Sequence, residues 1–162
     1  MTGVTGGTSD TKDETTDRHW MAEAQVLARQ AGLEGEVPIG AVIVRDGEIV
    51  GRGWNRNIGL NDPSAHAEIM AMRDAGNTLG NHRLPDCSLY VTLEPCPMCA
   101  GAMIHARLAR VDFGADDPKT GAAGGVFNLL GDPSHNHRVE VTGGCLAEEC
   151  SAMLKDFFKR RR

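Results

Sequence analysis

The sequence lacks any apolar run of roughly 18 residues, the length that a helix needs to cross a membrane, so no membrane-spanning segment is expected. The N-terminus also lacks the apolar stretch of a secretory signal peptide. There are only 5 cysteines, an odd number that suits a reducing cytoplasm better than a disulfide scaffold. The sequence also has fewer basic residues than acidic ones. The net charge is −5, which argues against tight, non-specific binding to nucleic acid.

The charges that are present are distributed unevenly along the 162 residues. Residues 1–17 combine threonine, glycine and four carboxylates with a single lysine, and we predict a disordered tail there. Residues 18–162 have the ordinary apolar share of a globular protein and are predicted to fold as one domain. The chain ends on four consecutive basic residues, Lys159 to Arg162, which concentrate positive charge on its last turn.

A His-x-Glu motif stands near the middle of the chain, at His66 and Glu68. The preceding Asp62-Pro63-Ser64 offers two residues that cap helices and a proline suited to the first helical position. The apolar residues that follow predict a helix that stops near Gly76. His66 and Glu68 are two residues apart in its first turn, so they point in different directions. A metal could therefore bind the imidazole while the carboxylate stays unbound.

Two cysteines follow a predicted strand farther along the chain. Residues 88–93 are rich in aliphatic, β-branched and aromatic side chains, which predicts a strand. Pro95 and Pro97 end that strand and open a second helix. Cys96 and Cys99 lie three residues apart in its first turn. Both thiols are therefore expected on one face of the helix, where the helix N-terminus lowers their pKa.

Together the two motifs supply one imidazole and two thiolates, a three-ligand set typical of tetrahedral Zn²⁺ with one open position. Glu68 is not needed as a ligand and stands beside that open position. This arrangement suits the activation of a water molecule, because zinc lowers the pKa of the water and a carboxylate can transfer its protons. We therefore predict that His66, Cys96 and Cys99 bind one Zn²⁺ and that Glu68 is the catalytic residue.

Three other interpretations of these residues stay open at this point. A Cys-x-x-Cys pair by itself also occurs in thioredoxin-like redox proteins. A fourth protein ligand would make the zinc structural, and Cys87 is the nearest candidate, although it stands at the far end of the predicted strand. The third interpretation is a zinc-stabilised binding module without catalysis, and the uncommitted Glu68 argues against it.

The predicted elements follow the order α-β-β-α-β-α-β-β-α. Asp17 is predicted to cap the first helix, and Asp46-Gly47 joins the first two strands in a hairpin. Strands interleaved with helices predict an α/β protein, a three-layer α/β/α sandwich with a mixed five-stranded sheet. The predicted helices and strands cover residues 18–32, 39–45, 48–54, 63–76, 88–93, 95–104, 111–114, 138–142 and 146–158.

With these motifs, the sequence resembles the zinc-dependent nucleoside and nucleobase deaminases, and among them the bacterial tRNA-specific adenosine deaminases. The resemblance runs from about residue 20 to residue 162 and implies a cytidine-deaminase-like fold. The zinc motif is common to the whole superfamily, whereas Lys-Thr-Gly-Ala-Ala-Gly and the basic C-terminal helix indicate the tRNA branch. The segments that carry the resemblance are residues 36–42, 53–56, 62–72, 89–105, 119–124 and 136–138.

The resemblance implies hydrolytic deamination of adenosine to inosine at the wobble position of a tRNA anticodon loop. It also implies a cytoplasmic homodimer that binds the anticodon stem-loop, with no membrane partner and no DNA partner. The alternative is a deaminase of a free nucleobase or nucleoside, guanine or cytosine, which would use the same zinc chemistry.

The resemblance further assigns substrate contacts. Asp116 departs from the family pattern, in which a basic residue is common at this position, and an acid there weakens a contact with phosphate. The substrate-binding residues implied are Asn55 in the base pocket and, for RNA phosphates, Lys119, Lys159, Arg160, Arg161 and Arg162.

Overall fold

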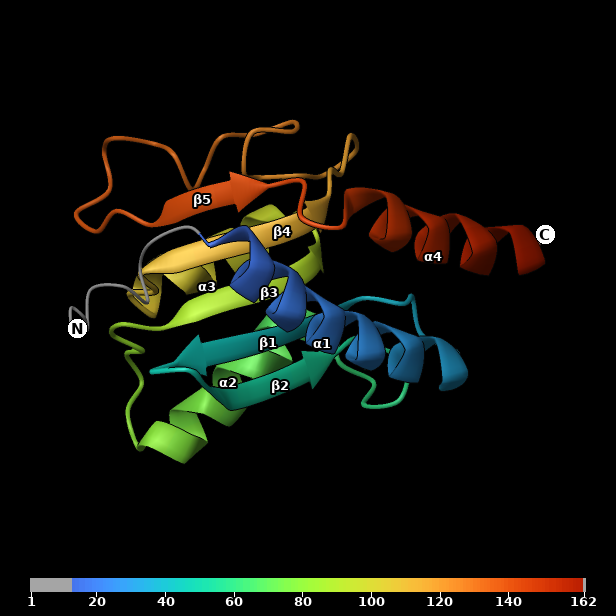
Figure 1. The fold of residues 1–162 in the computed structure, drawn as a ribbon, viewed down its shortest axis with the longest axis horizontal. Helices are drawn as coiled ribbons and strands as arrows, with labels where there is room; N and C mark the ends of the chain where they lie inside the picture. The colour runs from blue at the N-terminus through green and yellow to red at the C-terminus, as the bar shows by residue number, and fades with distance from the viewer. Residues whose placement is uncertain (1–12, 162) are drawn as a thin grey trace.

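A computed structural model describes residues 13–161 and arranges them as four helices and five strands in the predicted order (Figure 1). None of the helices in this range is long and apolar enough to cross a membrane. The helices are α1 (Glu14–Leu33), α2 (Ala67–Leu79), α3 (Pro97–His105) and α4 (Ala147–Arg160), and the strands are β1 (Gly40–Arg45), β2 (Glu48–Trp54), β3 (Ser88–Leu93), β4 (Arg110–Ala115) and β5 (Glu140–Gly143).

The five strands form one mixed sheet in the order β2-β1-β3-β4-β5. β1 pairs antiparallel with β2 and β3, whereas β3, β4 and β5 run parallel to one another. α2 and α3 cover one face, and α1 with the start of α4 covers the other, which confirms the three-layer α/β/α sandwich (Figure 1). Since β2, β3 and β4 all point the same way, the segments that follow them leave the sheet at a single edge.

Each face of the sheet has its own core, because successive side chains of a strand point to opposite faces. Ile43, Val91 and Val111 are buried against α2 and α3. Val42 and Tyr90 are buried on the other face, against α1 and α4. Burial on both faces explains why the sequences of β1 and β3 are apolar almost throughout rather than alternating.

Small residues allow α2 to pack directly on β2 and thereby fix the position of its first turn. A Cβ atom on Gly51 would lie 2.4 Å from the carbonyl oxygen of Ala71, and one on Gly53 would lie 2.2 Å from that of Ala67. Any side chain at either glycine would therefore push the helix away from the strand. α2 contributes Ala67, Ala71 and Ala75, all fully buried, to the same contact.

The structure corrects the predicted start of the first helix. α1 begins at Glu14, one turn earlier than predicted, and its cap is Asp13 rather than Asp17. The Asp13 carboxylate accepts hydrogen bonds from two backbone N–H groups of the first turn. The predicted disordered tail is therefore wrong for residues 13–17, and its remainder, residues 1–12, lies outside the described residues.

The helix that carries the His-x-Glu motif also differs from the prediction at both ends. Asp62 does not cap it, because its carboxylate accepts hydrogen bonds from the N–H and hydroxyl of Ser64, at 2.8 and 2.7 Å, within a turn. His66 is the residue at the N-cap position. α2 then continues past Gly76 and ends at Gly80, which has a left-handed φ of 65°. The other boundaries differ from prediction by at most two residues.

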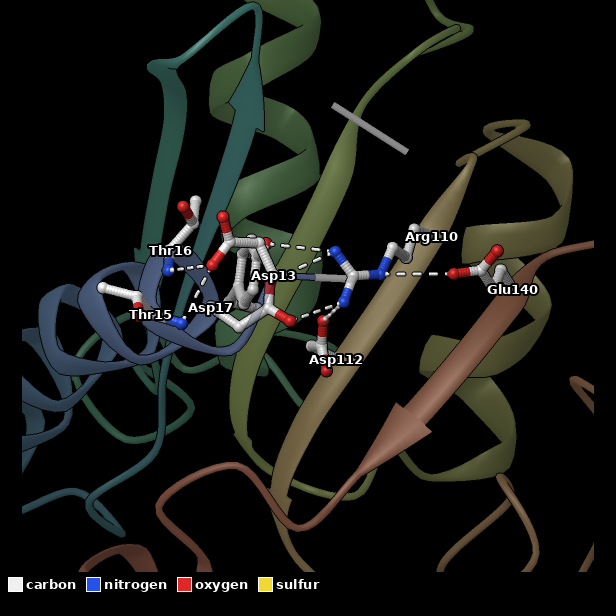
Figure 2. Close-up of polar contacts among 8 residues, drawn as sticks. Asp13, Thr15, Thr16, Asp17, Arg110, Asp112 and Glu140 are labelled. Carbon is white, nitrogen blue, oxygen red and sulfur yellow. Dashed lines mark hydrogen bonds and ion pairs between the residues drawn. The ribbon is translucent and has the colours of Figure 1, made fainter. Parts of the chain in front are cut away.

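A buried ion cluster joins α1 to the sheet (Figure 2). Arg110 on β4 is 1% exposed and donates two hydrogen bonds to the carboxylate of Asp17 on α1, Nη1 to Oδ1 at 3.1 Å and Nη2 to Oδ2 at 2.7 Å. Its Nη2 also lies 2.6 Å from Oδ2 of Asp112. The hydroxyl of Tyr90 donates to Asp17 at 2.7 Å, and the carboxylate of Glu140 lies 3.5 Å from Nε. These contacts explain why Asp17 is buried within α1.

Replacement of Asp17 by asparagine should destabilise the fold by about 3 kcal/mol, because a buried guanidinium then loses a charged partner. Glu140→Gln is the matched control: its side chain is 56% exposed, so its loss should cost less than about 1 kcal/mol. Urea unfolding followed by circular dichroism measures both changes in unfolding free energy. Equal effects would show that burial of the Asp17–Arg110 pair does not hold α1 to the sheet.

Candidate active site

Three side chains with metal-binding atoms meet at the edge where β2, β3 and β4 end. His66, Cys96 and Cys99 each offer one such atom, and the three atoms lie within 4.8 Å of one another. His66 and Cys96 are the N-cap residues of α2 and α3, and neither side chain makes a hydrogen bond that caps its own helix. Both side chains instead turn toward each other between the two helix N-termini. Within residues 13–161 this is the only such group of His, Cys, Asp and Glu side chains.

The separations fit a tetrahedral zinc site. Nδ1 of His66 lies 3.4 Å from Sγ of Cys99 and 3.5 Å from Sγ of Cys96. With Zn–N of about 2.0 Å and Zn–S of about 2.3 Å, a tetrahedral centre requires nitrogen–sulfur distances of about 3.5 Å. One imidazole and two thiols are also donors that Zn²⁺ prefers. These residues can therefore hold a zinc ion by three ligands and leave a fourth position open.

The two thiols differ in acidity. A hydrogen bond from Cys99 lowers the pKa of Cys96 to about 4. The same bond, together with burial, raises the pKa of Cys99 above its usual range. Cys96 is therefore the more acidic of the two, and binding of a divalent metal releases the protons that such thiols still carry.

Glu68 lies beside these ligands in the first turn of α2, where it is 4% exposed. Burial raises the pKa of its carboxyl group to about 7. A group with that pKa can both accept and donate a proton near neutral pH, which is the property required of a general acid–base. The structure therefore places a carboxyl group of suitable proton affinity next to the three metal-binding side chains.

The structure sets Cys87 apart from this group. It is fully buried and precedes β3, whereas Cys96 follows the opposite end of that strand. Burial raises the pKa of the Cys87 thiol to about 11, so it behaves as a small hydrophobic side chain. The fourth protein ligand that a structural zinc requires is therefore not supplied by Cys87.

Asn55 follows β2 and reaches the same edge of the sheet. It is 6% exposed, and its Oδ1 accepts a hydrogen bond from the backbone N–H of Ala67 at 2.8 Å. That N–H is one of the groups at the start of α2 that have no partner within the helix. This hydrogen bond holds the side chain of Asn55 next to His66 through its amide oxygen. The amide can still donate through its NH₂ group and accept at the second lone pair of its oxygen.

Some of the predicted RNA contacts share one groove. Lys119, in the loop after β4, and Lys159, on α4, line a groove of about 780 Å³ between these two segments. Lys155 and Arg161 line it as well. Phe158, which is 49% exposed, adds an aromatic ring to its wall. Basic and aromatic side chains in one groove are typical of surfaces that bind single-stranded nucleic acid.

Arg160 and Arg161 make contacts outside this groove. Arg160 pairs with Asp156 one turn earlier, at 2.9 Å, and lines a separate groove between α1 and α4. The guanidinium of Arg161 lies 4.4 Å from the ring centre of Phe157. Arg162 lies outside the described residues. Lys159 and Arg160 therefore line different grooves, and Arg161 lines both.

Sequence reasoning missed three residues at this edge. Lys155 could have been found, because it precedes Lys159 by one helical turn and shares its face. Glu36 and Glu94 are buried acids that accept hydrogen bonds from backbone N–H groups of residues 58–59 and 117–125. Their partners are distant in the sequence. The only local hint for Glu94 is its position directly before Pro95.

Known proteins are similar to this chain in sequence and in fold. The tRNA-specific adenosine deaminase of Haemophilus influenzae is 52% identical over 90% of this chain and 85% of its own length. That of Bacillus subtilis is 48% identical over 91% of this chain and 92% of its own. A solved structure from a study of A-to-I editing by tRNA:A34 deaminases is 47% identical, with a TM-score of 0.81 over 84% of this chain and 99% of that one.

More distant structures share the architecture as well. The guanine deaminase of Nitrosomonas europaea is 25% identical, with a TM-score of 0.77 over 86% of this chain and 83% of that one. The fold is thus the predicted cytidine-deaminase-like one. A family model described as MafB19-like deaminase matches residues 15–162. This chain therefore belongs to the MafB19-like deaminase family.

Proposed function

We propose that this chain hydrolytically deaminates adenosine to inosine at the wobble position of a tRNA anticodon loop. The observation that carries the proposal is the placement of a buried Glu68 beside His66, Cys96 and Cys99 at two helix N-termini. The choice of substrate is supported by relatives at 48% and 52% identity that are named tRNA-specific adenosine deaminase.

The chemistry divides between a bound zinc and the side chains around it. His66, Cys96 and Cys99 would hold one Zn²⁺ per chain, and the bound ion would lower the pKa of a coordinated water to about 7. Glu68 accepts a proton as the water adds to the adenine ring, and delivers it to a ring nitrogen. It then transfers the second proton to the amine, which leaves as ammonia. One carboxyl group, whose pKa is raised by burial, serves both transfers.

Asn55 and the start of α3 would hold the base during this reaction. The NH₂ group of Asn55 donates a hydrogen bond to the base, while the bond from the N–H of Ala67 to its oxygen holds the side chain in place. The backbone N–H of Cys96, at the helix N-terminus, stabilises the oxygen that adds to the ring. The target base has to leave its stack to enter the site, so an unpaired loop nucleotide costs least.

The groove lined by Lys119, Lys155 and Lys159 supplies the phosphate contacts in this proposal. Such a local basic surface can bind RNA despite a net charge of −5 on the whole chain. Phe158 offers a ring on which a flanking base can stack. Asp116 is exposed at the start of the loop that carries Lys119 and makes the potential there less positive.

The double change Lys155→Ala/Lys159→Ala should raise the KM for an anticodon stem-loop and leave fold and zinc content unchanged. The log–log dependence of its affinity on salt should become shallower by roughly 0.7 to 0.9 for each phosphate that the variant no longer neutralises. Steady-state kinetics at several salt concentrations measure both effects. A free nucleobase has no phosphate, so its turnover should hardly change.

Arg45→Ala/Arg83→Ala is the matched control, because it removes two positive charges at the opposite edge of the sheet. Arg45 ends β1, which runs antiparallel to β3, and Arg83 precedes β3. If this control raises the KM and flattens the salt dependence as much as the α4 variant, the groove is not where phosphate binds.

The alternative function is deamination of a free nucleobase or nucleoside, guanine or cytosine. The shared fold of a guanine deaminase supports it, although the identity is only 25%. Ammonia release from guanine, cytosine, adenosine and an anticodon stem-loop distinguishes the two. Turnover of guanine or cytosine without turnover of the stem-loop would assign the chain to the free-base deaminases.

The proposal includes a cytoplasmic homodimer, as the family resemblance implies. All five cysteines lie in the described part of the chain and are unpaired, which fits a reducing compartment. A monomer at micromolar concentration in analytical ultracentrifugation would contradict the dimer.

A further inference from the structure

Glu94 connects the metal motif to the loop that follows β4. It comes directly after β3 and before Pro95-Cys96, and it is only 2% exposed. Its Oε1 accepts a hydrogen bond from the backbone N–H of Asp117 at 2.9 Å. Its Oε2 accepts two more, from Ala123 at 3.0 Å and from Gly125 at 2.7 Å. Three backbone donors of one loop thus converge on one buried carboxylate.

The loop is shaped closely around this carboxylate. A Cβ atom on Gly121 would lie 2.3 Å from the carboxyl carbon of Glu94, and one on Gly125 would lie 2.6 Å from its Oε1. The N–H of Ala122 also donates to the carbonyl of Pro95 at 2.8 Å. The loop therefore has one position relative to the metal motif, and any added atom at these glycines would displace it.

Lys119 lies within this loop. The carboxylate of Asp117 accepts hydrogen bonds from the N–H groups of Lys119, at 3.0 Å, and Thr120, at 3.2 Å, which fixes the turn that carries the lysine. The side chain of Lys119 lines the basic groove beside α4. A short series of contacts, through Glu94 and Asp117, therefore joins the metal-binding Cys96 to the basic groove.

We propose that Glu94 is a positioning residue for the RNA substrate, holding residues 116–125 so that Lys119 meets a phosphate of the anticodon loop. This inference rests on the proposed function, because it says how the same site holds its RNA. A carboxylate suits the task because all its lone pairs accept, whereas a glutamine would turn an NH₂ group toward at least one N–H donor. In a Glu94→Gln variant the loop would shift, whereas the zinc ligands would keep their places on α2 and α3.

Glu94→Gln should raise the KM for an anticodon stem-loop about tenfold and change kcat little, because a phosphate contact contributes to binding and not to chemistry. The slope of log affinity against log salt concentration should become shallower by about one, which is the contribution of one phosphate contact. Zinc content, measured by elemental analysis, should equal that of the wild type. A fall in kcat at unchanged KM would overturn the proposal.

A double-mutant cycle with Lys119→Ala separates positioning from a general loss of stability. Lys119→Ala alone should raise the KM by a similar factor. In the Glu94→Gln background, Lys119→Ala should raise the KM by less than about twofold, because the displaced lysine no longer contacts its phosphate. Effects of the two substitutions that simply multiply would overturn the proposal.

Gly121→Ala reaches the same loop without changing a charge, since its new Cβ would press on the Glu94 carboxylate. It should reproduce the higher KM, the shallower salt slope and the coupling to Lys119. Glu36→Gln is the matched control: Glu36 is equally buried and accepts from the N–H groups of Ile58 and Gly59, in a loop without Lys119. It should leave the salt slope unchanged. If Glu94→Gln fails to fold and Gly121→Ala keeps the wild-type KM and slope, the proposal is overturned.

The wild type separates this inference from the proposed function. A wild-type chain that neither binds nor deaminates the stem-loop overturns the proposed function and this inference with it. A wild-type chain that deaminates the stem-loop, with variants at Glu94 and Gly121 that keep its KM, overturns the inference alone.

Discussion

Glu68→Gln is expected to fold, to keep its zinc and to lose nearly all deaminase activity. One general acid–base group contributes about 10²–10⁴ in rate, and the proposed mechanism assigns Glu68 two proton transfers in each turnover, so the loss should approach the upper end. The glutamine side chain has the same shape but cannot exchange a proton. Glu68 does not belong to the three-residue metal group, so zinc per chain should not change.

Initial rates of inosine formation at saturating stem-loop measure this loss. Glu36→Gln is a suitable control, because Glu36 is also a buried acid near the edge of the sheet that carries the site, at 3% exposed. Its substitution should keep the rate within about tenfold of the wild type, since it touches no reacting group. If the Glu68 variant keeps more than a tenth of the wild-type rate, another group must transfer the protons.

The features that could be predicted from the sequence depend on short-range patterns. The order of helices and strands follows from apolar periodicity, from the Asp46-Gly47 turn and from prolines at helix starts. The metal-binding group was also predictable, because His66, Cys96 and Cys99 each stand at the start of a predicted helix, where side chains can converge. Chemistry restricts such ligand sets to a few residue types and spacings.

The features that could not be predicted depend on pairs that are distant in the sequence. Asp17 was predicted to cap the first helix, yet it is buried against the sheet and its partner Arg110 lies 93 positions away. The three donors to Glu94 lie 23, 29 and 31 positions downstream of it, in a loop without regular structure. The basic C-terminus was treated as one cluster, but consecutive residues of a helix face different directions, so Lys159 and Arg160 line different grooves.

Loss of a zinc ligand is the second change with a very large expected effect. His66→Ala, Cys96→Ala and Cys99→Ala should each lose most of the bound zinc and essentially all activity. A catalytic zinc is held by only three protein ligands, so two that remain compete poorly with water for the ion. Elemental analysis of each purified variant gives zinc per chain, and the ammonia assay gives the activity.

Cys87→Ala is the matched control. Cys87 precedes β3, the strand that Cys96 follows, so the substitution removes a thiol without touching the metal-binding group. It should keep one zinc per chain and full activity, and cost only about 1 kcal/mol of stability for the missing buried sulfur. If Cys87→Ala loses zinc as completely as the ligand variants, four protein ligands surround the ion. No open position would then exist for the water on which Glu68 acts, and the deaminase mechanism would fail with it.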